Sequence, residues 1–101
     1  MADALILEFD GIGKAEYHAV SGKLGLDDGH WTQTAAPEGL VAHIAGEKPG
    51  GLVVIEVWES RAAQEKFMNE RLGKALQEGG VTSAPSRVEW MPVEHYEHLE
   101  R

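Results

Sequence analysis

Two apolar segments joined by a short polar turn constrain the fold of this chain more than any other feature. The first segment, GLVAHIAGE, covers residues 39–47, and the second, GLVVIEVW, covers residues 51–58. Between them, Lys48-Pro49-Gly50 has the composition of a tight chain reversal. The two segments are therefore predicted to pair as an antiparallel β-hairpin.

The segment before this hairpin predicts one strand and one helix. Residues 4–9, ALILEF, form a short apolar run that ends at turn-forming residues. From Lys14 to Leu24 the apolar residues recur at helical spacing, and Gly25 is placed to end that helix. Residues 26–38 show no sustained period and contain Gly and Pro, so they are predicted to form a loop.

The segment after the hairpin repeats this arrangement in reverse order. Ser60 is placed to cap a helix with an apolar stripe, which ends at Gly79 and Gly80. Residues 86–93 then form a last predicted strand, followed by a short tail. The resulting order βαββαβ is that of a ferredoxin-like α+β sandwich, a four-stranded antiparallel sheet with both helices on one face.

Composition limits the possible organisation and partners. The 101 residues are too few for two independent cores, so residues 1–101 are predicted to form a single domain. A net charge of -8 opposes binding to nucleic acid or to anionic membranes. No apolar run is long enough to span a membrane, and an acidic residue stands where a signal peptide would carry its basic residues, so a cytoplasmic location is expected by default. The chain has no cysteine, which excludes disulfides and thiolate chemistry.

Alternation along the predicted strands divides their side chains into two sets that point to opposite faces of the sheet. The set expected beneath the helices is Leu5, Leu7, Phe9, Val53, Ile55 and Val57. The set expected on the other face is Ile6, Glu8, Glu56, Trp58, Arg87, Glu89 and Met91. Because the second set is too apolar for solvent, a second subunit is expected to cover it, which predicts a homodimer. Residues 39–47 fit either orientation.

Several residues could carry chemistry. A histidine beside a carboxylate can be held in one tautomer and act as a base near neutral pH, so His43 and Glu56 are candidate catalytic residues. Tyr17 is the third candidate, and it lies on the apolar stripe of the first predicted helix, where it is also compatible with a core residue whose hydroxyl lies at a rim. Aromatic and imidazole groups suit the walls of a pocket for a flat phenolic ligand. The candidates for such walls are Trp58, Trp90, His18 and His95.

Each candidate also has a structural alternative. His43 is compatible with a core histidine bonded to a carbonyl or to Glu56, and both tryptophans are compatible with simple packing. Glu56 needs a partner if it is buried, because an unpaired buried carboxylate is unfavourable. Either Arg87 or a histidine could neutralise it at an interface, or it could serve as an acid in a site.

Two further motifs are rejected. GIGKAE follows a strand and opens a helix, but Glu16 stands at the third glycine position of a dinucleotide loop and would repel a pyrophosphate. His95 and His98 are spaced to bind a metal on a helix, but no third ligand is evident nearby in the sequence. No metal is therefore expected.

The sequences VVIEVWESRAAQEKF, RLGKAL and VEWMPVEHY, in this layout, resemble the dimeric α/β-barrel proteins of the antibiotic biosynthesis monooxygenase group, and more closely their small uncharacterised members. The resemblance covers residues 4–96. It implies two sheets paired face to face as a barrel, with a ligand pocket between the helices and the sheet of each subunit.

Some proteins of this superfamily oxidise polycyclic phenols without metal or flavin, and others break open haem. The resemblance places the helical Trp of these proteins at Phe67, which joins the candidate ligand contacts, and the axial haem histidine at Gln77. The asparagine associated with both activities has no counterpart on the first strand, since the chain's single asparagine is Asn69. No cofactor is expected.

Two functions stay open. The first is a cofactor-independent monooxygenase, or a related cyclase or isomerase, that acts on an aromatic or polyketide-like molecule with His43 as proton acceptor. The second is a non-catalytic homodimer that binds a small molecule.

Overall fold

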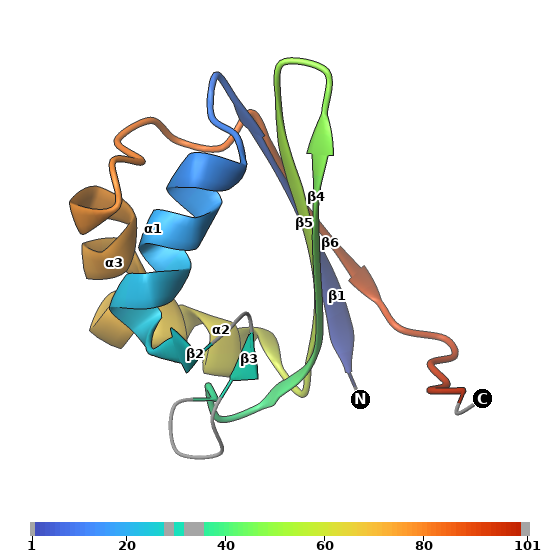
Figure 1. Ribbon diagram of the computed structural model, residues 1–101. Helices are drawn as coiled ribbons and strands as arrows, with labels where there is room; N and C mark the ends of the chain where they lie inside the picture. The colour runs from blue at the N-terminus through green and yellow to red at the C-terminus, as the bar shows by residue number, and fades with distance from the viewer. Residues whose placement is uncertain (1, 28–29, 32–35, 100–101) are drawn as a thin grey trace.

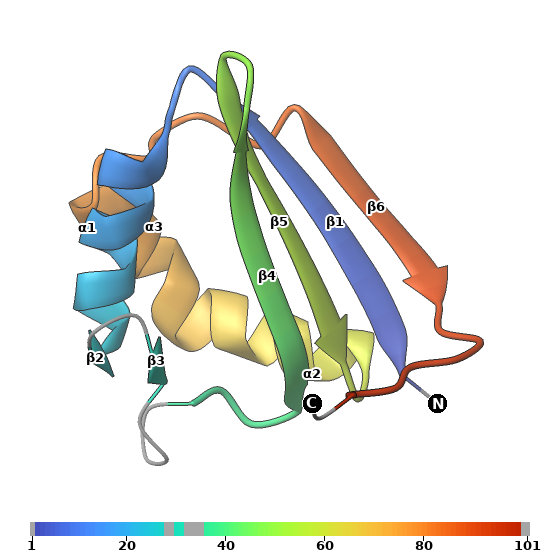
Figure 2. The same ribbon diagram turned by 45° about the vertical axis from the view of Figure 1, so that its right-hand side comes forward.

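The computed structural model describes residues 2–27, 30–31 and 36–99 and consists of two layers, a sheet and a set of helices on one of its faces (Figure 1). The sheet is antiparallel and has the strand order β4-β5-β1-β6. Its strands are β1 (Asp3–Asp10), β4 (Leu40–Lys48), β5 (Gly51–Trp58) and β6 (Arg87–Pro92). Figure 2 shows the predicted hairpin of β4 and β5 at one edge of the sheet and β6 at the other.

The helical layer has two parts. Helix α1 (Lys14–Leu24) ends at Gly25, which has a left-handed backbone with φ 89°. The second part is α2 (Arg61–Phe67), a π-helical segment η1 (Met68–Leu72) and α3 (Gly73–Glu78) in direct succession. Ser60 caps α2 as predicted, because its Oγ accepts a hydrogen bond from the Ala63 N–H at 3.1 Å.

These elements confirm the ferredoxin-like α+β fold. The segment predicted to be a loop differs in one respect, because it contains a small two-stranded sheet of β2 (Leu26–Asp27) and β3 (His30–Trp31). The rest of that segment lies partly outside the described residues. In the described part of the chain, no helix has the length and apolar character that crossing a membrane requires.

The predicted assignment of β5 to the two faces is wrong. The register pairs Leu5 with Glu56 and Leu7 with Val54, and directly paired residues of neighbouring strands point to the same face. Glu56 and Trp58 therefore lie beneath the helices with Leu5, Leu7 and Phe9. The residues that replace them on the open face are Val53, Ile55 and Val57.

The open face is apolar at its centre and charged at one end. A row of paired residues across β4, β5 and β1 consists of Ile44, Ile55 and Ile6, and Ile44 is 62% exposed. At the end of the sheet near the β4–β5 turn, Glu8 bonds both Lys48 and Arg87 at 2.9 Å. As predicted, Ile6, Glu8, Arg87, Glu89 and Met91 belong to this face.

Candidate functional site

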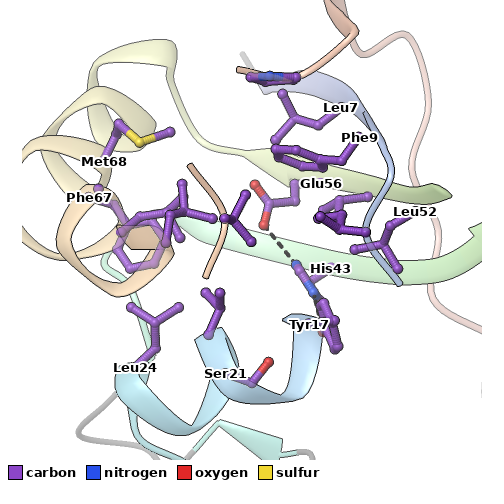
Figure 3. A pocket seen from close by; sticks show the side chains of 18 of the residues that line it. Leu7, Phe9, Tyr17, Ser21, Leu24, His43, Leu52, Glu56, Phe67 and Met68 are labelled. Atoms are coloured by element: carbon purple, nitrogen blue, oxygen red, sulfur yellow. Dashed lines mark hydrogen bonds and ion pairs between the residues drawn. The ribbon is translucent and has the colours of Figure 1, made fainter. Parts of the chain in front are cut away.

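A cavity of about 360 Å³ lies between the helices and the sheet (Figure 3). Its walls are mainly apolar. The sheet contributes Leu7, Phe9 and Val54, and the helical layer contributes Phe67, Leu72 and Leu76. Such a cavity has the size and character of a small-molecule pocket.

A chain of hydrogen-bonding side chains begins at the wall of this cavity. The Tyr17 hydroxyl lies 2.8 Å from His43 Nε2, and His43 Nδ1 lies 2.7 Å from Glu56 Oε2 (Figure 3). The second carboxylate oxygen, Glu56 Oε1, accepts a hydrogen bond from the Trp58 indole N–H at 3.0 Å. Tyr17, His43 and Glu56 all line the cavity.

The secondary structure explains how these residues meet. His43 and Glu56 are directly paired residues of β4 and β5, so their side chains emerge side by side on the helix-covered face. Trp58 follows Glu56 by two positions on the same strand and points to the same face. Tyr17 comes from α1, and its ring stacks on His43 with centroids 6.1 Å apart.

Glu56 is buried without a lysine or arginine partner among the described contacts. It is 7% exposed, and its hydrogen-bond partners are the nitrogen atoms of His43 and Trp58. The predicted alternative of Arg87 as its partner is wrong, because Arg87 bonds Glu8 and Glu89 on the open face. The alternative of a histidine partner is observed.

The donor and acceptor types of these groups determine which atom donates in each hydrogen bond between Tyr17, His43, Glu56 and Trp58. An indole N–H can only donate, so Glu56 Oε1 is an acceptor. With Glu56 as the acceptor of the His43 Nδ1–H, the Nε2 lone pair is left to accept the Tyr17 hydroxyl proton. Burial, opposed in part by the hydrogen bond with Ser21, raises the pKa of Tyr17 above its ordinary value, and the charge of Glu56 raises it further. Tyr17 therefore acts as a neutral hydrogen-bond donor.

This assignment predicts a late titration of Tyr17. The chain has 2 tyrosines, so Tyr96→Phe leaves Tyr17 as the single tyrosine. Because the pKa of Tyr17 is raised, tyrosinate absorbance in that variant is expected to appear at a higher pH than for an exposed tyrosine. Because the folded state holds this proton more tightly than the unfolded state, the free energy of unfolding should also fall as the pH rises through that range. Adding Glu56→Gln should lower the midpoint, whereas an unchanged midpoint would contradict the proximity of the two groups.

The other predicted wall residues differ in their positions. Phe67 lines the cavity, and its ring lies 5.7 Å from the fully buried Trp58 ring. Trp90 is half-buried beneath Arg61, and neither it nor Trp58 is among the residues that line the cavity. His18 is exposed beside Tyr17, and His95 is exposed in the tail, where it bonds Glu97.

Some cavity residues were not predicted from the sequence. Ser21 lies one helical turn after Tyr17, and this i,i+4 spacing was a usable signal. Trp31 of the short strand β3 and the irregular residues 81–85 also line the cavity, but they come from segments whose sequences have no sustained period. In the described part of the chain, no group of three or more His, Asp or Glu side chains could hold a metal ion.

Solved structures share this fold. SnoaB from Streptomyces nogalater, described as a cofactor-independent oxygenase, is 12% identical over 94% of this chain and 95% of its own, with a TM-score of 0.62. A protein described as an antibiotic biosynthesis monooxygenase is 18% identical over 92% of this chain and 98% of its own, with a TM-score of 0.58. A protein of unknown function from Nitrosomonas europaea is 17% identical over 99% of this chain and 96% of its own, with a TM-score of 0.67.

Neither a protein-family model nor a curated protein sequence matches the chain. The class that the structural matches define is the ferredoxin-like fold of the antibiotic biosynthesis monooxygenase-like proteins, which confirms the predicted resemblance at the level of fold. At these identities the similarity shows the fold alone.

Proposed function

We propose that the protein is a small enzyme that oxidises an aromatic or polyketide-like molecule without a cofactor, with His43 as proton acceptor. The observation that carries this proposal is the Tyr17–His43–Glu56 chain at the wall of an otherwise apolar cavity. The shared fold of SnoaB, described as a cofactor-independent oxygenase, supports it.

The arrangement suits removal of a proton from an acidic phenol or from a carbon next to a carbonyl. As the substrate gives its proton to the Tyr17 oxygen, the Tyr17 proton passes to His43 Nε2, and Glu56 stabilises the imidazolium. The electron-rich anion can then reduce dioxygen. In the net reaction a CH₂ group becomes a carbonyl with one oxygen atom, and the other oxygen atom leaves as water with the two hydrogens.

The proposal can be tested in two stages. Aromatic compounds with and without an acidic hydroxyl are first screened by thermal shift, and the ligands are then tested for oxygen consumption. We expect hydroxylated ligands to be consumed with uptake of one O₂ per molecule, and the matched compounds without the hydroxyl to bind without turnover. If compounds that bind tightly are recovered chemically unchanged and no oxygen is consumed in their presence, the protein is not an enzyme of this kind.

The alternative is a non-catalytic protein that binds a small molecule. One observation favours it, because the Tyr17 hydroxyl already occupies His43 Nε2. In that case the polar chain serves to hold β4, β5 and α1 together. A ligand that stabilises the protein but is recovered unchanged after prolonged incubation in air would select this alternative.

We also propose that a second copy of the chain covers the open face of the sheet. The exposed row around Ile44 and Ile55 is the apolar centre that such an interface needs, and the tail of residues 94–99 extends on the same side (Figure 1). Light scattering is expected to give twice the chain mass of 11.0 kDa. Ile55→Glu should yield monomers, whereas Gln77→Glu, the same charge change on an exposed part of α3, should not. A parent protein that is monomeric at micromolar concentration would disprove the dimer.

Haem is not expected to bind. Phe67 lies in the cavity wall and Gln77 is exposed on α3, so these two positions supply no axial ligand. Titration with hemin should therefore give no stoichiometric Soret band. A tight one-to-one complex would contradict this prediction, and replacing His43, His18 and His95 singly would then identify the ligand.

A further inference from the structure

The Trp58 indole N–H has a partner inside the site rather than a backbone carbonyl. It donates to Glu56 Oε1 at 3.0 Å, while Glu56 Oε2 bonds His43. We infer that Trp58 is a positioning residue whose N–H holds Glu56 as an oriented acceptor and thereby keeps His43 in the tautomer with an unprotonated Nε2. This inference rests on the proposed role of His43 as proton acceptor.

The packing around Trp58 makes it a rigid donor. Its side chain is 0% exposed, and its ring lies against Phe67 at a centroid distance of 5.7 Å. Because the indole is enclosed, it cannot swing away from Glu56 without disturbing the core. Since Phe67 lines the cavity, Trp58 stands directly behind the cavity wall without lining the cavity itself.

Glu56 needs this second donor. A buried carboxylate oxygen without a hydrogen bond is unfavourable, and the cations Lys48 and Arg87 bond Glu8 on the opposite face of the sheet. With Oε1 bound to a group that can only donate, rotation of the carboxylate is restricted and Oε2 stays directed at His43 Nδ1.

The orientation of Glu56 decides which nitrogen of His43 carries the proton. An imidazole nitrogen that donates to a carboxylate keeps its proton, and the other nitrogen is then free to accept one. In this structure the accepting nitrogen is Nε2, which faces Tyr17 and the cavity. Trp58 thus acts on the proton acceptor through two hydrogen bonds without touching a substrate.

Imidazole ¹⁵N shifts of the ligand-free protein test this inference. In the parent, the neutral imidazole of His43 should carry its proton largely on Nδ1. Trp58→Phe keeps an aromatic ring but removes the N–H, and the Nδ1-protonated fraction of His43 is expected to fall at least twofold. Trp90→Phe removes an indole N–H from the same sheet face without touching Glu56, and should leave the tautomer unchanged. A folded Trp58→Phe protein with the parental tautomer would overturn the inference.

A second measurement keeps the test valid if Trp58→Phe does not fold. The chain has 3 tryptophans, so the parent should show three indole N–H signals at most. The Trp58 signal should be slow to exchange and should move strongly in Glu56→Gln, while the signal of Trp90 should not. An unmoved Trp58 signal would overturn the inference. Neither measurement uses a substrate, so a failure of the proposed oxidation would leave these results interpretable.

Discussion

Replacing Trp58 by alanine is expected to lower the free energy of unfolding by about 3–5 kcal/mol. The side chain is 0% exposed, so its removal leaves a cavity beside Phe67 and deletes a large buried area. It also leaves Glu56 Oε1 without its donor. Urea denaturation should therefore show a lower midpoint with an unchanged m-value, because the surface exposed on unfolding stays similar.

Trp90→Ala is the matched control for this prediction. Trp90 lies on the same sheet face but is only half-buried, so its truncation should destabilise the protein less than that of Trp58. Trp58→Phe separates the two effects, since it restores most of the packing without the N–H. A Trp58→Ala protein as stable as the parent but unable to bind a validated ligand would show instead that the indole is part of the binding site.

The secondary structure was predictable because local residues signal it. Ser60 caps its helix, Gly25 ends another with a positive φ, and the hairpin of residues 39–58 carries its own turn. The π-helical segment Met68–Leu72 was not predicted, because the apolar stripe runs through it without a break. The prediction of the ferredoxin-like fold rests on the order of the helices and strands, so the unpredicted π-helical segment did not affect it.

The assignment of β5 to the two faces failed for a physical reason. Alternation within a strand separates two sets of side chains but does not say which set is covered. Val53, Ile55 and Val57 are the more apolar set, yet the register with β1 turns Glu56 and Trp58 toward the helices. The result is a polar group in the interior and an aliphatic surface on the open face, which hydrophobicity alone would not favour.

This inversion is also what assembles the candidate site. His43 fitted either face of its strand, and pairing with Glu56 places it beneath α1, where Tyr17 meets it. The sequence thus predicted a contact between His43 and Glu56 as one alternative, but not that Tyr17 joins them beneath the helices. Trp31 was not predicted as a cavity residue because it lies in a two-residue strand, within a sequence without a period, that only the tertiary structure places against the cavity.

Replacing His43 by asparagine is expected to reduce kcat on a validated substrate by about 10²–10⁴-fold, the usual contribution of a positioned general base. The binding affinity should change much less, because the apolar walls around Leu7, Phe9 and Phe67 stay in place. Steady-state oxygen uptake together with ligand-induced thermal shift would measure both effects.

His18→Asn is the matched control for the His43 prediction. His18 lies beside Tyr17 on α1, but its side chain is exposed and does not line the cavity. Its replacement should leave kcat close to the parent value, because an exposed side chain outside the cavity wall does not contact the substrate. Equal losses in both variants would point to a disturbed α1 rather than to a lost base. If His43→Asn stays active, another group must be the proton acceptor. Glu56 would then be tested through Glu56→Gln.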